Sequence, residues 1–236
     1  MSDGLNNGCA LVTGAGRGIG RAVALALGRR GISVALLART RADLDETARL
    51  LEQQAGPRAT SHVITCDVAD AAAVTAACNE IIERFGAPRV VINNAGVVRR
   101  ALLADTSEAD WDAVLGVNLK GTFLVTRALL PAMLLCGTGR IVNVASLSAT
   151  VGTARQTAYN AAKWGVVGFT KSLAEELRGT GLQALAVLPG SVDTKMLVGS
   201  GFAPQMSAEA VAGTLVYAAL DAPDAMNGSA IEVFGP

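Results

Sequence analysis

The sequence has few of the residues that build metal sites, disulfide frameworks or histidine-based catalytic sites. Its single histidine, His62, begins a strand-like run far from the other motifs. Its cysteines are widely separated and include no Cys-x-x-Cys pair: Cys9, Cys66, Cys78 and Cys136. This pattern disfavours zinc binding, disulfide bonding and a histidine-based triad. We therefore expect no metal site, buried free thiols, and a packing or surface role for His62.

The chain also lacks net charge and long hydrophobic runs. Lysine plus arginine and aspartate plus glutamate number 20 each, so no global imbalance draws the chain to nucleic acid or to an anionic membrane. About half of the residues (51%) are hydrophobic, yet no stretch approaches the roughly 18 apolar residues of a membrane span. Residues 1–8 lack the basic and then apolar pattern of a signal peptide. We predict a cytoplasmic protein with neither a nucleic-acid nor a membrane partner.

What the sequence does contain is a regular alternation of strand-like and helix-like segments, without a linker rich in proline, glycine or serine. Its length of 236 residues favours one domain, residues 1–236. Alternating strands and helices imply parallel pairing through right-handed crossovers, so the predicted fold class is α/β, a single Rossmann-type doubly wound parallel sheet flanked by helices on both faces. Short aliphatic or β-branched runs predict about seven strands: Ala10–Thr13, Ile32–Ala38, Ser61–Thr65, Arg89–Asn93, Arg140–Ala145, Leu182–Leu188 and Ala230–Phe234.

Candidate functional residues follow the ends of four predicted strands. Thr13 ends the first strand, and residues 93–96 close the fourth. Ser146 follows the fifth, and Pro189-Gly190 follows the sixth. In a doubly wound sheet, ligands bind beyond the carboxyl ends of the strands, near the point where strand order reverses. We therefore expect these four segments to line one crevice.

A glycine-rich turn, Gly14 to Gly20, lies between the first strand and the helical pattern of Ala22 to Leu27. Glycines let the backbone turn sharply and approach phosphate oxygens, and the N-terminus of the next helix presents free N–H groups. The turn is therefore predicted to hold the phosphates of a cofactor. Its spacing differs from the Gly-x-Gly-x-x-Gly dinucleotide fingerprint, and an ordinary tight turn is the alternative.

The end of the second strand indicates which dinucleotide is preferred. A carboxylate there would hold the ribose 2′-hydroxyl of NAD, but the sequence is Ala38-Arg39-Thr40-Arg41, with no acceptor at Ala38. A cation suits a 2′-phosphate better, so Arg39, with Arg17 from the glycine turn, predicts NADP, with NADPH preferred. The alternative is that Arg39 and Arg41 are solvated residues at the start of a helix.

Tyr159 and Lys163 stand one helical turn apart. A neighbouring ammonium favours the phenolate, and at an effective dielectric near 20 two unit charges about 4 Å apart interact by roughly 4 kcal/mol. That energy would lower the pKa of a tyrosine from about 10 towards 7. The pair therefore predicts a proton donor usable at neutral pH, although two exposed helix neighbours would have the same spacing.

Taken together, these motifs resemble those of the short-chain dehydrogenase/reductase family over nearly the whole chain. The pattern is Thr13-Gly14-x-x-x-Gly18-x-Gly20, Asn94-Ala95-Gly96, Asn118, Ser146, Tyr159-x-x-x-Lys163 and Pro189-Gly190-Ser191-Val192-Asp193-Thr194, in this order. The subclass that it resembles is the 3-oxoacyl-acyl-carrier-protein reductase type of small carbonyl reductase. The ending Val233-Phe234-Gly235-Pro236 departs from the Asp-Gly-Gly ending common in that subclass.

The resemblance implies a role for each catalytic candidate. Tyr159 would be the general acid in ketone reduction and the base in alcohol oxidation, and Lys163 would lower its pKa and hold the nicotinamide ribose. Ser146 would hydrogen-bond the substrate oxygen, and Asn118 would help hold a water that relays protons to Lys163. Hydride arriving at a carbonyl carbon leaves negative charge on the oxygen, which needs aimed donors and a proton.

The resemblance also implies cofactor contacts. Asp67 matches a position that contacts adenine, with a helix cap before residues 71–73 as the alternative. The cofactor-binding residues implied are Thr13, Gly14, Arg17, Gly18, Ile19, Gly20, Arg39, Asp67, Val68, Asn94, Ala95, Gly96, Tyr159, Lys163, Pro189, Gly190, Val192 and Thr194.

A short segment, about residues 193–206, is expected to cover the substrate as a flap that would suit an acyl chain or varied hydrophobic ketones. The function predicted is NADPH-dependent reduction of a ketone, including a 3-oxoacyl thioester, to a secondary alcohol. The alternatives are an NAD-linked hydroxysteroid or polyol dehydrogenase and a non-catalytic dinucleotide sensor. Relatives pair through the helices expected at Asp112–Leu135 and Thr157–Arg178, which implies a homodimer or homotetramer; core packing of these helices is the alternative.

Overall fold

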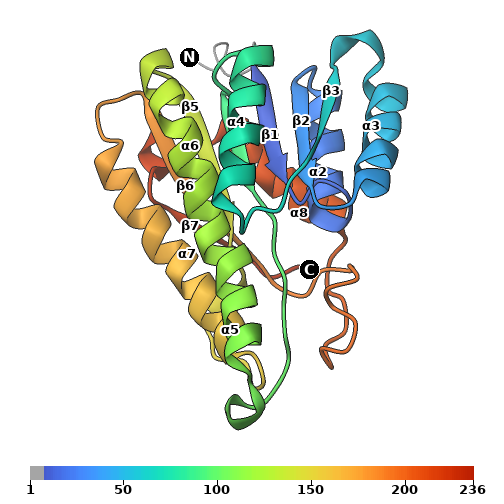
Figure 1. Ribbon diagram of the computed structural model, residues 1–236, viewed down its shortest axis with the longest axis vertical. Coiled ribbons are helices and arrows are strands. Elements are labelled where there is room, and N and C mark those ends of the chain that lie inside the picture. The colour runs from blue at the N-terminus through green and yellow to red at the C-terminus, as the bar shows by residue number, and fades with distance from the viewer. Residues whose placement is uncertain (1–7) are drawn as a thin grey trace.

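The computed structural model describes residues 8–236, and a seven-stranded parallel sheet forms its centre (Figure 1). The strand order is β3-β2-β1-β4-β5-β6-β7, so the order reverses between β1 and β4. The predicted fold class is thereby confirmed, and each predicted strand end lies within one residue of the observed one. The strands are β1 (Cys9–Thr13), β2 (Ser33–Ala38), β3 (Ser61–Thr65), β4 (Val90–Asn93), β5 (Gly139–Val144), β6 (Leu182–Pro189) and β7 (Ala230–Val233). Except for Gly8, the stretch tested for a signal peptide lies outside the described residues.

Helices cover both faces of the sheet (Figure 1). One layer contains α2 (Gly18–Arg29), α3 (Arg41–Ala55) and α8 (Ala208–Val216). The other contains α4 (Ala71–Phe85), α5 (Glu108–Leu115), α6 (Gly121–Cys136) and α7 (Thr157–Glu176). Successive side chains of a strand point to opposite faces of the sheet. In β1, Ala10 and Val12 therefore pack against the first helix layer, and Cys9 and Leu11 pack against the second.

The helix predicted at Asp112–Leu135 is interrupted. It consists of α5, a π-helical turn at Gly116–Lys120, and α6. Asn118 sits in this wider turn and donates its Nδ2 hydrogens to the carbonyls of Val97 and Val114, both at 2.8 Å. Such turns often occur at functional sites, and this one directs Asn118 towards the loop after β4.

The stretch Glu108–Cys136 also passes, by length and composition alone, as a helix that could cross a membrane, the one such helix within residues 8–236. It lies against the sheet, where Val125, Leu129 and Met133 are fully buried in the core. This packing accounts for part of its apolar composition, since Phe123, Leu134 and Leu135 of the same stretch are exposed.

The cysteines and the histidine occupy structural positions. Cys9, Cys66 and Cys78 are buried free thiols, as expected, whereas Cys136 is exposed at the end of α6. His62 contacts Glu80, with 2.6 Å between Nε2 and Oε1, and it meets the Phe85 ring edge-on. Its surface and packing role agrees with the sequence-based prediction.

Candidate active site

Two adjoining cavities lie at the carboxyl ends of the strands. The larger, about 600 Å³, runs over the glycine turn and the ends of β2 and β3. The smaller, about 350 Å³, lies between the loop after β5, helix α7 and the flap. Ile19, Asn94, Gly96 and Thr194 line both, so the cavities form one continuous crevice next to the reversal of strand order. This is where the sequence placed the ligand site.

The glycine turn is shaped by close backbone approach. Gly14 has a φ of +65°, a conformation that favours glycine, and a Cβ there would lie 2.9 Å from the Cα of Ala95. A Cβ on Gly20 would collide with the Gly14 carbonyl oxygen. The Asn94 amide donates to the carbonyls of Thr13, at 3.0 Å, and Gly14, at 3.4 Å. The turn therefore has the tight form and the free helix N-terminus that a pyrophosphate requires.

Thr13 and Gly20 shape the crevice without lining it. The Thr13 hydroxyl accepts hydrogen bonds from the backbone N–H groups of Asn94 and Ala95, both at 3.0 Å. Gly20 packs under the turn, and neither residue reaches the surface of either cavity. Their predicted place in the cofactor site is therefore one of support.

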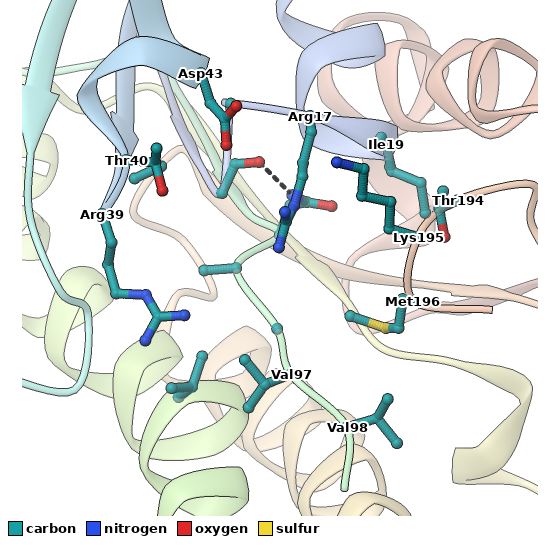
Figure 2. Close-up of a pocket in the computed structure, with 18 of the residues that line it drawn as sticks. Arg17, Ile19, Arg39, Thr40, Asp43, Val97, Val98, Thr194, Lys195 and Met196 are labelled. Carbon is teal, nitrogen blue, oxygen red and sulfur yellow. Dashed lines mark hydrogen bonds between the residues drawn. The ribbon is translucent and has the colours of Figure 1, made fainter. Parts of the chain in front are cut away.

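Four arginines line the larger cavity, and two of them come from the glycine turn and from the end of β2. Arg17, from the glycine turn, and Arg39, after β2, direct their guanidinium groups into it from different sides (Figure 2). Ala38 also lines the cavity, and no carboxylate stands at that position. Arg39 lies 3.9 Å from Asp67, and both side chains are largely exposed, so this ion pair is weak and leaves Arg39 available. Arg41 instead pairs with Asp45 at 2.7 Å on the surface and does not line the cavity.

Asp67 and Val68 line the larger cavity, as the adenine-contact prediction requires. The alternative for Asp67 was wrong, because Asp70 caps α4 by accepting hydrogen bonds from the N–H groups of Ala72 and Ala73. Asp67 instead accepts from the N–H of Ala69 at 3.0 Å. The sequence pattern did not distinguish these two aspartates, because each precedes the same helix.

Ser146, Tyr159 and Lys163 line the smaller cavity together. Tyr159 and Lys163 come from one face of α7, and Ser146 comes from the loop after β5. The Lys163 ammonium donates to the carbonyl of Val144 at 2.7 Å and lies 5.6 Å from the centre of the Tyr159 ring. Both side chains are buried, so the alternative of two exposed helix neighbours is wrong.

Burial sets the pKa values of this pair. Desolvation raises the pKa of the Tyr159 phenol, and a hydrogen bond from Ser146 and the charge of Arg100 oppose it. Desolvation also lowers the pKa of Lys163 to about 8. The structure therefore contradicts the expected lowering of the Tyr159 pKa towards 7, because removal of the phenol from water outweighs the hydrogen bond from Ser146 and the charge of Arg100.

Asn118 is buried and does not line the smaller cavity. Its two amide hydrogens are used by backbone carbonyls, while its Oδ1 is buried and has no partner within the described chain. A buried acceptor without a partner is costly, so a water at Oδ1 would be stabilising. A water at this oxygen is what the expected proton relay would use.

A buried polar network fixes α7 against the sheet. Asn93 on β4 donates to Thr126 of α6 at 3.0 Å and to Asn143 of β5 at 2.9 Å. Asn143 in turn donates to Thr170 of α7 at 2.9 Å. These bonds link β4, β5, α6 and α7, so they help to hold the helix that carries Tyr159 and Lys163 against the sheet, while the buried Oδ1 of Asn93 has no partner within the described chain.

Other predicted residues lie at the surface of the crevice. Gly14, Gly18, Ala95 and Thr194 line the cofactor side, and Pro189, Gly190 and Val192 line the side next to Tyr159. Sequence reasoning missed further lining residues, since isolated side chains in loops carry no pattern. They include Gly16, Thr40, Asp43, Val97, Val98, Arg99 and Arg100 on the cofactor side, and Leu147, Val151 and Gln156 beside Ser146 and Tyr159. Lys195 and Met196, which also line the cofactor side, belong to the segment expected as the flap.

Comparison with known proteins finds one enzyme family. The family model described as short chain dehydrogenase matches residues 8–201. The chain is 41% identical over 202 residues to a human (3R)-3-hydroxyacyl-CoA dehydrogenase. The aligned region covers 83% of this chain and 77% of that protein. It is 37% identical over 246 residues to D-threitol dehydrogenase of Mycolicibacterium smegmatis, with 98% and 93% covered.

Two further similarities agree with these. The chain is 40% identical over 187 residues to a 3-oxoacyl-[acyl-carrier-protein] reductase of Staphylococcus aureus, with 79% of this chain and 75% of that protein covered. The crystal structure of levodione reductase superposes with a TM-score of 0.91 at 28% identity, and 96% of each chain is covered.

Proposed function

Because the chain belongs to the short-chain dehydrogenase/reductase family of oxidoreductases, which act on hydroxyl and carbonyl groups with a nicotinamide dinucleotide, we propose that it reduces a ketone to a secondary alcohol with NADPH. The observation that carries this proposal is the meeting of Ser146, Tyr159 and Lys163 at one cavity wall, next to the crevice of the glycine turn. We also propose that residues 1–236 form one dinucleotide-binding and catalytic domain.

The residues of this chain would act on the oxygen of the substrate. The bound nicotinamide supplies the hydride. The Ser146 hydroxyl donates a hydrogen bond to the carbonyl oxygen, which gains negative charge. Tyr159 stays protonated at neutral pH because burial raises its pKa, and it can give its proton to that oxygen because an alkoxide is a stronger base than a phenolate. Lys163 is charged below about pH 8 and stabilises the phenolate that remains. Asn118 would help to return a proton through water.

We base the proposed preference for NADPH on the residues at the end of β2 and on the glycine turn. Arg17 and Arg39 both reach the larger cavity, and Ala38 stands where a carboxylate would bind the 2′-hydroxyl of NAD. The glycine turn is shaped as a dinucleotide pyrophosphate requires, so the residues fit the cofactor. Asp67 and Val68 would then border the adenine.

A 3-oxoacyl thioester is one candidate substrate, because relatives named for hydroxyacyl and oxoacyl thioesters cover about four fifths of the chain. The second candidate function is an NAD-linked polyol dehydrogenase. D-threitol dehydrogenase favours it, since that relative covers 98% of this chain. A comparison of kcat/KM for NADPH and NADH, with ketones and with polyols, separates the two.

The test of the catalytic role is Tyr159→Phe, with Tyr217→Phe as the matched control, because Tyr217 is the other tyrosine and lies far along the chain at an exposed position. NADPH oxidation by activated ketones should be lost in Tyr159→Phe, while NADPH affinity stays within about threefold. Turnover that survives the substitution would refute the role of Tyr159. Tight NADPH binding by the wild type, without turnover of any carbonyl tested, would favour a sensor.

We further propose a cytoplasmic homodimer or homotetramer. The exposed face of α6 and α7 carries several large apolar side chains, a pattern typical of subunit interfaces. These are Phe123, Leu134, Leu135 and Trp164.

A further inference from the structure

One cationic residue of the crevice has no place in the reaction described so far. Arg100 belongs to the loop after β4, and it lines both the larger and the smaller cavity. It therefore stands where the cofactor side of the crevice meets the side of Tyr159 and Ser146.

The flap holds the Arg100 guanidinium in place. Its Nη2 donates to the carbonyl of Met196 at 2.8 Å, and its Nη1 to the carbonyl of Val198 at 3.4 Å. Its Nε is buried and has no hydrogen-bond partner within the described chain. Backbone carbonyls orient the group but do not neutralise its charge, so the guanidinium is fixed with both its charge and one donor unpaired.

No carboxylate compensates this charge. Across residues 8–236, no aspartate or glutamate forms an ion pair with Arg100. The described lining of the smaller cavity includes two cations, Arg100 and Lys163, and no acidic residue. The neighbouring Arg99, by contrast, pairs with Asp110 at 3.3 Å. A cavity of this kind, with low-dielectric walls and one sign of charge, concentrates ligands of the opposite sign.

The rest of the smaller cavity is apolar or neutral. Val98, Val151, Leu147 and Phe202 supply apolar surface, and Gln156 supplies an uncharged polar group. A volume of about 350 Å³ is sufficient for a small molecule rather than for a long acyl chain. The ligand that suits this lining is small, partly apolar and negatively charged at one end.

Building on the proposed reduction of a ketone with NADPH, we infer that Arg100 is a specificity-determining residue that binds a carboxylate of the substrate, so that the preferred substrates are small oxo acids rather than 3-oxoacyl thioesters, which have no carboxylate next to the ketone. The carbonyl of such a substrate meets Ser146 and Tyr159, and its carboxylate meets the Arg100 guanidinium. Formation of that pair satisfies the unpaired charge, and the flap carbonyls of Met196 and Val198 keep the guanidinium oriented for it.

The test compares each oxo acid with its methyl ester: acetoacetate with methyl acetoacetate, and levulinate with methyl levulinate. Arg100 also acts on the pKa of Tyr159 and on the flap, but those effects change acid and ester alike. The ratio of the two kcat/KM values therefore isolates the contact with the carboxylate. Arg100→Gln removes the charge, and Arg100→Lys keeps it without the planar fork.

Arg155→Gln is the matched control. Arg155 is exposed and lines neither cavity of the crevice. Its backbone lies close to Arg100, because the Arg155 carbonyl accepts a hydrogen bond at 3.1 Å from the N–H of Ala101, the residue after Arg100. Its removal deletes the same unit charge close to Arg100 without touching the site. We expect Arg155→Gln to change the acid-to-ester ratio by less than about twofold.

A binding measurement gives a second readout that does not require turnover. With NADPH bound, 3-hydroxybutyrate cannot react because both partners are already reduced, so calorimetry reports binding alone. We expect Arg100→Gln to lower the acid-to-ester ratio of kcat/KM by about ten- to hundredfold and to weaken 3-hydroxybutyrate binding by a similar factor. Arg100→Lys should fall between wild type and Arg100→Gln, and NADPH affinity should change by less than about threefold.

The inference fails if acid and ester lose kcat/KM equally in Arg100→Gln, if wild type shows no preference for the acid, or if Arg155→Gln lowers the ratio as much. It also fails if Arg100→Gln weakens NADPH binding and leaves the acid-to-ester ratio of kcat/KM unchanged. That result would assign Arg100 to the cofactor. If no carbonyl is reduced but 3-hydroxybutyrate binds in an Arg100-dependent manner, the proposed function fails and the carboxylate site stands.

Discussion

Replacement of Lys163 by methionine should stabilise the fold while abolishing turnover. Lys163 is buried, and its pKa falls from 10.5 in water to about 8 in the folded chain. Keeping a proton on this amine at neutral pH therefore opposes folding, and the pKa difference corresponds to about 3 kcal/mol. Methionine has a similar length and carries no charge. Loss of the hydrogen bond to the Val144 carbonyl offsets part of the gain, by about 1 to 2 kcal/mol.

The pH dependence of this stability difference provides the sharper test. Between pH values of about 8 and 10.5 the unfolded state binds more protons at this lysine than the folded state does, so the wild type should gain stability from this group as pH rises. The difference in unfolding free energy between Lys163→Met and wild type should thus be largest near pH 7 and smaller by about 2 to 3 kcal/mol near pH 10. The buried thiols of Cys9 and Cys78, whose pKa values burial raises to about 11 and 12, have the opposite effect on stability, but they are common to both proteins and cancel.

The assay is urea unfolding without cofactor, at a fixed protein concentration, at several pH values. Lys171→Met is the matched control, because it makes the same change on the same helix at an exposed position. Its difference from wild type should stay within about 0.5 kcal/mol across this pH range. The account of Lys163 as a buried cation would be refuted if the difference in unfolding free energy between Lys163→Met and wild type did not change with pH, or if it increased towards pH 10.

Two further predictions concern the cofactor and the assembly. Arg39→Ala should lower kcat/KM for NADPH about ten- to hundredfold and change that for NADH by less than about threefold, because the lost contact is charge-assisted. Arg41→Ala, which removes a surface pair with Asp45, is the control, and strong NADH preference in wild type would favour the NAD-linked alternative. Trp164→Lys should lower the molar mass measured by light scattering to that of a single chain, since Trp164 is 54% exposed on the apolar face of α7. An unchanged multimer would place the interface elsewhere, and a monomeric wild type would contradict the proposed assembly.

Much of the fold could be predicted because it depends on local pattern. Aliphatic runs located all seven strands to within one residue at each end, since a strand buried on both faces needs continuous apolar sequence. The π-helical turn at Asn118 could not be predicted in this way, because it depends on hydrogen bonds from the Asn118 side chain to the carbonyls of Val97 and Val114.

Part of the candidate site could likewise be predicted from the sequence, and part could not. The order of the motifs and the family that they resemble singled out Ser146, Tyr159 and Lys163, and the structure brings the three together because residues that follow parallel strands or share one helix face meet at one edge of the sheet. The sequence by itself therefore determined the family, the sheet and the three residues that line one cavity wall. The direction of the pKa shifts and the unpaired charge of Arg100 were decided only by the tertiary structure, because both depend on how far each group is removed from water and on which carboxylates lie close to it.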